Sequence, residues 1–291
     1  MSATAGYLLV RNPRSGSASD DALVARARKR LADVESFDLD PHADLAGAID
    51  RALLEDRVVV AAGGDGTVNA VVQHLAARGT LGVIPGGTLN HFARDLGVRD
   101  PDRALETLER GKPRPIDLGR ADGKVFVNGV GLGLYPEVVR ERDRSWQPFG
   151  RWVAGAAASV GVLRRATPLV GTVSVDGDDR QLDAWIVFVG NNRFGAAPGR
   201  IGARERLDEG VLDVRLLTAS GRTRGPVNLA WAVLRDRAWV GRRLVRAEAR
   251  RVEIHVTAGP RLLSLDGEVS DAVDHAVIEI VPRALRVLHP L

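Results

Sequence analysis

The sequence predicts two folded regions of different class: an α/β domain followed by an antiparallel all-β domain. Over the first 117 residues, short apolar strand segments alternate with amphipathic helical segments, which is typical of a parallel sheet covered by helices. After residue 117 the chain changes to short strands separated by Asp-Gly pairs, which favour hairpin turns between antiparallel strands. The length of 291 residues is sufficient for two domains.

Each expected element has its own local signal. In the first region the expected strands are residues 7–10, 34–39, 58–62 and 81–84, and the expected helices are residues 20–31, 43–54 and 67–77. A further helix has Asp100 as its N-cap, Pro101 in its first turn and Gly111 past its end. In the second region we expect strands at 173–175, 185–189 and 252–256, and two helical segments near 149–165 and 226–240.

The composition is that of an ordinary globular protein, with 45% apolar and 27% charged residues. The lack of cysteine excludes disulfides, zinc–thiolate sites and cysteine nucleophiles, and it fits a reducing compartment. Only three of the 41 basic residues are lysines, so the pI near 10.0 reflects arginine usage, which we interpret as a compositional bias. No aromatic–basic interleaving or recognition-helix motif supports nucleic-acid binding.

The sequence also predicts where the protein works. The first apolar run, residues 7–10, is short and fits a strand instead of a signal peptide. The longest weakly polar stretch, residues 153–163, is too short to cross a bilayer. We therefore expect a cytoplasmic protein whose contact with membranes is peripheral.

Glycine-rich turns follow three of the expected strands, in the stretches RNPRSGSAS (11–19), AGGDGTVN (62–69) and IPGGTLNHFARDLG (84–97). Because the carboxyl ends of parallel strands meet at one edge of a sheet, these turns bring polar side chains together there. The residues concerned are Asn12, Asp65, Thr67, Thr88 and Asn90. Their hydroxyl and amide groups suit phosphate oxygens, and backbone N–H groups at a helix start favour an anion.

Two familiar phosphate motifs are excluded by inspection. Neither Gly-Lys pair is followed by Ser or Thr, so there is no P-loop, and no G-x-G-x-x-G opens the first helix. The stretch GVGLGL at 129–134 lacks the last glycine of that pattern and lies in the antiparallel region. We expect it to be a close-packed β turn.

The chain resembles the diacylglycerol kinase catalytic-domain family of bacterial lipid kinases, which are related to sphingosine kinases. The resemblance rests on five stretches and their order: NPRSG, GGDGTVN, PGGTLNHFARDLG, LDEGVLDV and LDGE. GGDG alone also occurs in NAD kinases and phosphofructokinases, and the other stretches narrow the choice. The resemblance implies an α/β nucleotide-binding domain over residues 1–117, completed by a C-terminal strand at about 283–291. It further implies an antiparallel β-sandwich that binds the lipid over residues 118–282, with the active site in the cleft between the domains.

The resemblance implies that ATP and Mg²⁺ bind the first domain. Phosphoryl transfer depends on positioning and charge neutralisation, so backbone N–H groups of Gly64, Gly66 and Thr67 would hold the phosphates. Asp65 would bind or orient the metal together with Asp117 of PIDLG, although Asp117 alone also fits a carboxylate at the end of a strand. The full set of expected nucleotide-binding residues is Asn12, Gly63, Gly64, Asp65, Gly66, Thr67, Asn69, Gly87, Thr88 and Asn90.

The resemblance also implies a catalytic pair, Asp266 and Glu268 of SLDGEVS, in which Asp266 takes the proton of the lipid hydroxyl and Glu268 supports it. From the residues alone, Asp266-Gly267 fits an ordinary two-residue hairpin turn equally well. Residues 204–214 resemble a structural magnesium loop with ligands at Arg206, Glu209 and Val211, the outer two through main-chain carbonyls. Glu209 stands where the family has Asp, and Mg²⁺ tolerates little departure from octahedral geometry.

One further departure from the family pattern concerns the metal. His91 follows Asn90 where many members have Asp, which removes a negative charge from the expected metal network. The sequence says little about how the lipid is bound. Residues 146–163, with Trp146, Phe149, Trp152 and Val153, fit either a pocket wall or a core. The arginine-rich helix expected near 226–246 fits either a surface that contacts anionic lipid or a solvated face.

These patterns together predict an ATP-dependent kinase that transfers the γ-phosphoryl group of ATP to a lipid hydroxyl, with diacylglycerol as the leading acceptor. Two alternatives stay open at this point. One is a kinase of the NAD kinase type with a soluble acceptor, and the other is a nucleotide-binding regulator with little turnover, which His91 motivates. The sequence does not specify which lipid is used or the oligomeric state.

Overall fold

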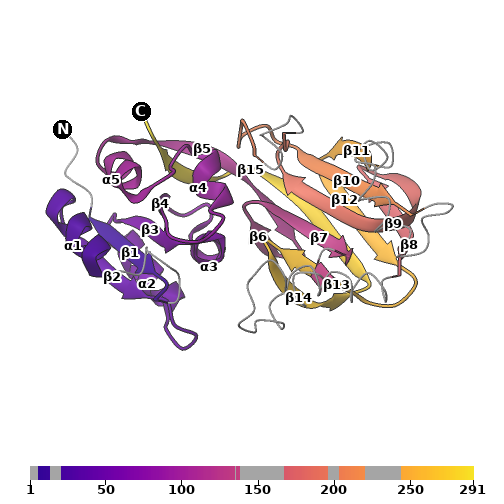
Figure 1. The fold of residues 1–291 in the computed structure, drawn as a ribbon, viewed down its shortest axis with the longest axis horizontal. Coiled ribbons are helices and arrows are strands. Elements are labelled where there is room, and N and C mark those ends of the chain that lie inside the picture. The colour runs from indigo at the N-terminus through magenta and orange to yellow at the C-terminus, as the bar shows by residue number, and fades with distance from the viewer. Residues whose placement is uncertain (1–5, 14–20, 135, 138–166, 196–202, 220–243) are drawn as a thin grey trace, which may run out of the picture. The chain divides into compact units, whose positions relative to one another are not determined.

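The computed structural model describes residues 6–13, 21–134, 136–137, 167–195, 203–219 and 244–291 (Figure 1). The chain divides into two compact units. The first unit contains Met1–Asn128, Asn192–Gly210 and Val281–Leu291, and the second contains Gly129–Asn191 and Val211–Ile280. These limits differ from the expected ones because residues 118–128, 192–195 and 203–210 belong to the first unit. The assignment of the domains as 1–117 with 283–291, and 118–282, stays a prediction.

The first unit is built on a parallel sheet, as expected. Its strands are β1 (Tyr7–Arg11), β2 (Val34–Asp38), β3 (Val58–Gly63) and β4 (Thr80–Pro85) in the order β2-β1-β3-β4. The C-terminal strand β15 (His275–His289) adds to β4 in parallel, with Arg286 opposite Thr80. β5 (Lys112–Ala121) pairs with β15 and, antiparallel, with β6 (Lys124–Phe126). The central strands are apolar and buried, as strands covered on both faces must be.

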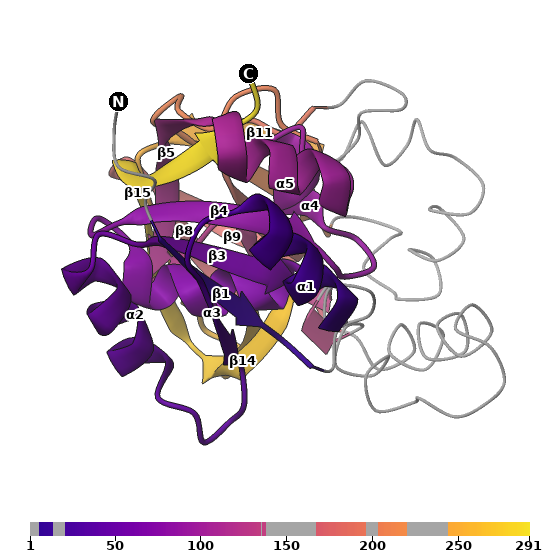
Figure 2. The ribbon, with the colours of Figure 1, turned by 90° about the vertical axis from the view of Figure 1, so that its left-hand side faces the viewer.

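Helices cover both faces of this sheet (Figure 2). α2 (Leu45–Leu54) packs on α3 (Asp65–Leu75), while α1 (Asp21–Arg30) packs on α5 (Pro101–Arg110) on the other side. Asp100 caps α5 by accepting the N–H of Arg103, and Pro101 starts the helix, as predicted. α3 begins at Asp65, two residues earlier than expected, so that Asp65 itself lies in its first turn. The five-residue helix α4 (His91–Asp95) was not expected.

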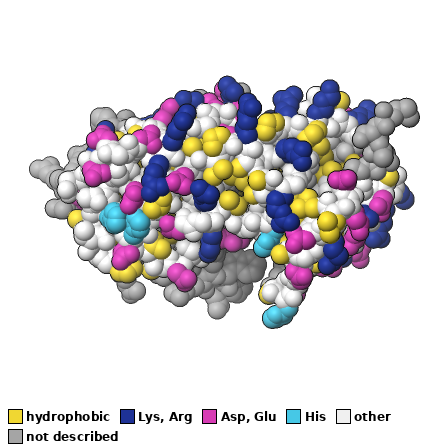
Figure 3. Space-filling model, turned by 180° about the vertical axis from the view of Figure 1, so that it is seen from behind, with side chains coloured by type: hydrophobic (Ala, Val, Ile, Leu, Met, Phe, Trp, Pro, Cys, Tyr) yellow, Lys and Arg dark blue, Asp and Glu magenta, His cyan; other side chains and the backbone are white. Residues whose placement is uncertain are grey.

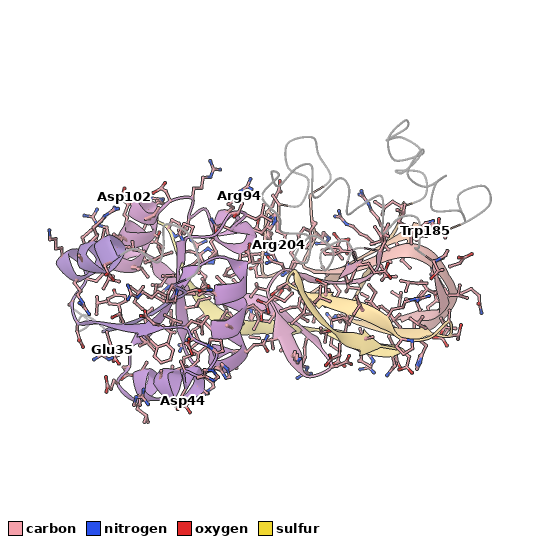
Figure 4. All side chains as sticks on the ribbon, turned by 60° about the horizontal axis from the view of Figure 1, so that its bottom comes forward. Glu35, Asp44, Arg94, Asp102, Trp185 and Arg204 are labelled. Atoms are coloured by element: carbon pink, nitrogen blue, oxygen red, sulfur yellow. The ribbon has the colours of Figure 1, made fainter. Side chains whose placement is uncertain are left out.

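A buried ion pair fixes the segment 203–210 within the first unit. The Arg204 side chain is fully buried, and its Nε lies 2.7 Å from Oδ2 of Asp95, which is 4% exposed. Arg204 also donates to the carbonyl of Val127 and, over 2.8 Å, to Oδ1 of Asn128 (Figure 4). Its guanidinium lies 5.1 Å from the centre of the Phe194 ring, a cation–π distance. The Arg204 side chain thus joins α4, the residues that follow β6 and the segment 203–210.

The second unit is antiparallel throughout its described pairs, as expected. Its strands are β7 (Gly129–Gly133), β8 (Leu169–Val175), β9 (Asp178–Asn191), β10 (Leu212–Thr218), β11 (Leu244–Ala249), β12 (Arg251–Val256), β13 (Arg261–Leu265), β14 (Glu268–Val273) and the first part of β15. They follow the order β14-β13-β7-β9-β8-β12-β15, with β10 between β9 and β11. The fold class, α/β plus antiparallel all-β, is confirmed.

Two details of the second unit differ from expectation. GVGLGL is not a turn: Gly129–Gly133 form the buried strand β7 between β9 and β13. Close packing requires glycine at two of its positions, because a Cβ on Gly129 would lie 2.8 Å from the Phe188 ring and one on Gly133 would lie 2.4 Å from the Trp185 carbonyl oxygen. The helix expected near 226–246 is wrong over its last residues, because β11 begins at Leu244 and pairs with β10. The remaining part of that helix, the segment 149–165 and the stretch 146–163 lie outside the described residues.

Within the described ranges, no helix combines the length and the apolar character needed to span a bilayer.

The buried pair allows a stability prediction. Asp95→Ala should lower the free energy of unfolding by about 3–5 kcal/mol, because it leaves the Arg204 guanidinium buried without its counter-ion. Chemical denaturation of the first unit, followed by far-UV circular dichroism, measures the change. Asp50→Ala is the matched control: Asp50 pairs with Arg78 at the surface, where both side chains are about half exposed, and its loss should cost at most about 1 kcal/mol. Equal effects of the two variants would contradict the analysis.

Candidate active site

The two glycine turns after β3 and β4 touch each other. β3 and β4 are neighbours in register, with Gly63 opposite Pro85, and the N–H of Gly86 donates to the carbonyl of Gly63 over 2.9 Å. A Cβ on Gly87 would lie 2.6 Å from the Cα of Gly64, so a side chain there would push the turns apart. Glycine at position 87 is therefore needed for the contact between the two turns, and the backbone at this sheet edge stays bare.

Asp65 ties the same two turns together through its side chain. Its Oδ2 accepts the N–H of His91 and its Oδ1 accepts the N–H of Phe92, each over 3.1 Å. These are the first N–H groups of α4, so Asp65 serves as the N-terminal acceptor of a helix 26 residues further along the chain. Each carboxylate oxygen still has a lone pair after accepting one N–H. The half-buried carboxylate can therefore bind a further donor or a metal ion from the solvent side.

The second turn is closed by Asn90, which has a left-handed backbone at φ 47°. Its Oδ1 accepts the N–H of Gly87 and its Nδ2 donates to the Gly87 carbonyl, both over 2.8 Å. Thr88, which lies between Gly87 and Asn90, is exposed, and so is His91. Asn90 therefore shapes the turn, and Thr88 is the expected phosphate-binding residue that the turn leaves open to solvent.

The other expected nucleotide-binding residues on α3 are turned inward. Thr67 is 3% exposed, and its Oγ1 lies over Gly63, where a Cβ would come within 2.3 Å of it. Asn69 is 7% exposed, and its Oδ1 accepts a hydrogen bond from Gln73 over 3.0 Å. Gln73 in turn exchanges two hydrogen bonds with the backbone of Val125 in β6. At the sheet edge, these residues therefore present the backbone of the first turn of α3. The N–H groups of Gly66 and Thr67 have no acceptor within the helix.

At the first strand, Asn12 directly follows β1 and is half-buried, so it lies at the carboxyl edge of the sheet as expected. The structure thus brings Asn12 and the two glycine turns to one edge of one sheet. Their role in binding nucleotide stays a prediction.

Asp117 lies in β5 and is 1% exposed. Its Oδ2 accepts the N–H of Gly210 over 2.7 Å, and its Oδ1 accepts the N–H of Arg283 over 2.9 Å. Its own N–H donates to the Leu207 carbonyl. The carboxylate therefore holds three chain segments of the first unit together, including Arg283 in β15, whose backbone is left-handed at φ 53°. This contact pattern fits the structural interpretation of Asp117, and its role as a metal ligand stays a prediction.

Glu209, the expected acidic ligand of a structural magnesium ion, is paired with an arginine. Its Oε1 lies 2.7 Å from Nη1 of Arg193, and its Oε2 accepts the Arg193 N–H over 3.2 Å. Arg206, whose carbonyl was expected to complete the site, pairs through its side chain with Asp208. The guanidinium of Arg193 neutralises Glu209 in this arrangement, which offsets the negative charge that would attract a magnesium ion. Assignment of Arg206, Glu209 and Val211 as ligands stays a prediction that requires Glu209 to leave Arg193.

In the second unit, Asp266 and Gly267 form the hairpin turn between β13 and β14. Their φ angles of 50° and 89° are those of a type I′ turn. The turn is anchored on β7: the N–H of Gly129 donates to Oδ1 of Asp266, and the N–H of Asp266 donates to the Gly129 carbonyl, each over 2.9 Å. The hairpin interpretation is therefore confirmed. The backbone contact fixes the carboxylate, which a general base requires, and the catalytic role itself stays a prediction.

Glu268 follows the turn and keeps exposed surface. Desolvation by the surrounding chain raises the pKa of its carboxyl above the usual range, and the negative charge of Asp266 raises this pKa further. The proton is therefore held more tightly than on an ordinary glutamate, and the two carboxylates are electrostatically coupled.

Sequence reasoning missed the residues that fix these turns from a distance. Arg204 lies 109 residues from its partner Asp95, and Arg193 lies 16 residues from Glu209. Neither arginine stands in a pattern that marks it among the other arginines of the chain.

The fold and the glycine-turn edge define a two-domain kinase architecture, and comparison with known proteins agrees. Residues 6–121 match the model described as "Diacylglycerol kinase catalytic domain", and residues 131–289 match that described as "YegS C-terminal NAD kinase beta sandwich-like domain". The diacylglycerol kinase of Bacillus subtilis is 30% identical over 226 residues, which are 76% of this chain and 74% of that protein.

Two solved structures show the same fold at low identity. A diacylglycerol kinase from Bacillus anthracis superimposes with a TM-score of 0.67 at 20% identity and covers 98% of this chain and 96% of its own. An NAD kinase from Archaeoglobus fulgidus in complex with ATP gives a TM-score of 0.54 at 14% identity, covering 98% and 94%. The chain belongs to the diacylglycerol kinase catalytic-domain family and is an ATP-dependent lipid kinase, a phosphotransferase with an alcohol group as acceptor.

The coupling of the two carboxylates is testable. Asp266→Asn should lower the pKa of Glu268, because it removes the neighbouring negative charge, but desolvation should keep this pKa above that of a free glutamate. An NMR titration of the labelled Glu268 carboxyl measures the shift. Asp271→Asn, a change on the same strand β14, serves as control and should move the pKa less. An unchanged pKa in Asp266→Asn would show that the two groups are not coupled.

Proposed function

We propose that this lipid kinase transfers the γ-phosphoryl group of ATP to the free hydroxyl of diacylglycerol. In this reaction the bond between the γ-phosphorus and its bridging oxygen breaks, a new bond to the lipid oxygen forms, and the hydroxyl proton leaves. The products are ADP and the phosphorylated lipid. Diacylglycerol is the leading acceptor because the Bacillus subtilis relative, which matches three quarters of the chain, is a diacylglycerol kinase.

The observation that carries the proposal is the contact between the two glycine turns. Gly64 and Gly87 meet without side chains at the carboxyl ends of adjacent parallel strands, beside the N-terminus of α3. Phosphates bind where bare backbone N–H groups face solvent at a helix start, and this edge has both features. ATP phosphates would accept from Gly64, Gly66 and Thr67, with Thr88 and Asn12 at the periphery. Asn90 shapes the second turn through its hydrogen bonds to Gly87, whereas Asn69 lies on α3 and accepts a hydrogen bond from Gln73.

A magnesium ion fits Asp65 better than the loop around Glu209. The Asp65 carboxylate accepts two backbone N–H groups and retains a free lone pair on each oxygen, whereas Glu209 is occupied by Arg193. Bound there with ATP, Mg²⁺ would neutralise charge on the phosphate oxygens. The N–H groups of His91 and Phe92 would hold the Asp65 carboxylate in one orientation for the ion. Asp117 would support the site through the segments that it ties together.

Asp266 is our candidate for the general base. The Gly129 N–H fixes one of its oxygens, and the other would take the proton from the lipid hydroxyl. The raised pKa of Glu268 supports a secondary role, in which this carboxyl shares the proton near Asp266. We further propose that the protein is cytoplasmic and meets its substrate by peripheral contact with the membrane.

A soluble-acceptor kinase of the NAD kinase type is the second candidate. The fold of the Archaeoglobus fulgidus enzyme favours it in general terms, but that likeness is at 14% identity and concerns the fold alone. Phosphorylation of NAD in the absence of lipid and detergent would establish this activity.

The acceptor and the base can be tested in one assay. Labelled ATP and Mg²⁺ are offered with diacylglycerol, a sphingoid base, phosphatidylglycerol or a prenol in mixed micelles, with NAD as a soluble control. We expect label in diacylglycerol, and Asp266→Asn should reduce its rate by about 10²–10⁴-fold, the usual contribution of a general base. ATP binding by the variant should be unchanged.

Asp176→Asn is the matched control for this assay. Asp176-Gly177 is a hairpin turn of the same geometry in the same unit, with φ angles of 50° and 90°, and its carboxylate also accepts backbone N–H groups, those of Arg250 and Arg251. This variant should retain transfer. An equal loss in both variants would assign Asp266 to the turn alone, and label in NAD only would replace the lipid acceptor.

His91 separates a kinase from a nucleotide-binding regulator. The Asp65 carboxylate contacts the backbone N–H of His91, which a substitution leaves in place, and the residue is exposed. We therefore expect His91→Asp to change the maximal rate by less than about tenfold, or about 1.4 kcal/mol of barrier. Steady-state kinetics with Mg²⁺ titration measures this. A large rise in both Mg²⁺ affinity and turnover would indicate that the natural chain is a weakly active regulator.

A further inference from the structure

Two histidines and a glutamate lie together on the exposed face of the second unit. β12 and β15 are antiparallel neighbours, and His255 in β12 is directly opposite His275 in β15. Glu253 lies two residues before His255, so all three side chains project from the same face of the sheet. The alternate residues Val252 and Ile254 are buried on the other face. Figure 3 shows a patch of histidine side chains with acidic and basic side chains near it, apart from the other histidines in that view.

The ligand atoms of the three side chains are close enough to share one ion. Oε1 of Glu253 lies 2.9 Å from Nε2 of His275 and 3.4 Å from Nε2 of His255. One ligand atom from each of the three residues lies within 4.8 Å of the others. In a tetrahedral zinc site with bonds of about 2.0–2.1 Å, neighbouring ligand atoms are about 3.4 Å apart. The distances of Glu253 from His275 and from His255 are close to this spacing.

Neighbouring groups orient the carboxylate. Arg251 lies on the same face and contacts Oε2 of Glu253 at 3.3 Å, and it also pairs with Glu279 of β15. These contacts leave Oε1 directed toward the imidazoles. In metal sites, second contacts of this kind hold a ligand in its binding orientation.

We propose that His255, His275 and Glu253 form a binding site for a divalent transition-metal ion such as Zn²⁺, with two imidazole nitrogens and one carboxylate oxygen as ligands and water in the fourth position. Imidazole and carboxylate together suit zinc, copper and nickel, whereas Mg²⁺ prefers oxygen ligands alone. The rings are stacked at 4.2 Å with 21° between their planes, so binding requires one imidazole to rotate. Both histidines are about half exposed, which permits the rotation. The bound ion would cross-link β12 and β15.

The test is a calorimetric titration of the full chain with Zn²⁺ alone as ligand, at neutral pH and in the presence of excess Mg²⁺. The Mg²⁺ occupies oxygen-only sites, so the heat reports the histidine site. We expect one binding event, and the exchange of either histidine or of Glu253 for glutamine should weaken it by about 10–100-fold or more. Thermal unfolding is the second readout, because an ion that binds only the folded chain raises its melting temperature.

His42→Gln is the matched control. His42 is an exposed histidine in a turn of the first unit, and its loss should leave Zn²⁺ binding unchanged. Absence of Zn²⁺ binding by the natural chain would overturn the proposal. So would Zn²⁺ binding that survives in both His255→Gln and His275→Gln. Neither result bears on the kinase, because none of these residues belongs to the candidate active site.

Discussion

The candidate site depends on the bond between one carboxylate and the start of one short helix. Asp65 belongs to the first turn of α3, yet both of its oxygens accept N–H groups of α4. This contact makes two loops, each of which is a simple strand-to-helix turn, into one rigid edge. The requirement for glycine at position 87 follows from it, because a Cβ there would lie 2.6 Å from the Cα of Gly64, and a Cβ on Gly64 would be tight at 3.2 Å from the Cα of Gly87.

The three Asp-Gly hairpins illustrate how little local geometry says about role. Asp122, Asp176 and Asp266 have φ angles of 47°, 50° and 50°, and the glycines that follow them all have φ near 90°. They differ in their distant partners. The carboxylate of Asp176 caps the backbone at Arg250 and Arg251, whereas that of Asp266 meets Gly129 at the start of a buried strand. The catalytic role proposed for Asp266 would therefore depend on the surroundings of the hairpin.

The sequence was sufficient for those parts of the fold that local patterns determine. The apolar strands, the Asp100–Pro101 helix start and the glycine turns all have their signal within a few residues, and they were predicted at nearly the right positions. The parts that were missed depend on contacts between distant segments. The return of residues 203–210 to the first unit depends on the pair Arg204–Asp95 and on the bonds of Asp117. The pairing of Glu209 with the guanidinium of Arg193 is a further contact that no local pattern indicates. Arginine is so frequent in this chain that the relevant ones cannot be distinguished before the fold brings them to their partners.

The strand β15 contributes to the sheets of both units, first beside β12 and then beside β4. Its partner in the first unit, Thr80, is about 200 residues away along the chain, and such distant pairings form slowly. During synthesis, therefore, neither sheet can be completed before residues 275–289 have left the ribosome. Until then the apolar edge of β4 is without its neighbour, and a nascent chain of this kind is exposed to mispairing and is a natural client for a chaperone.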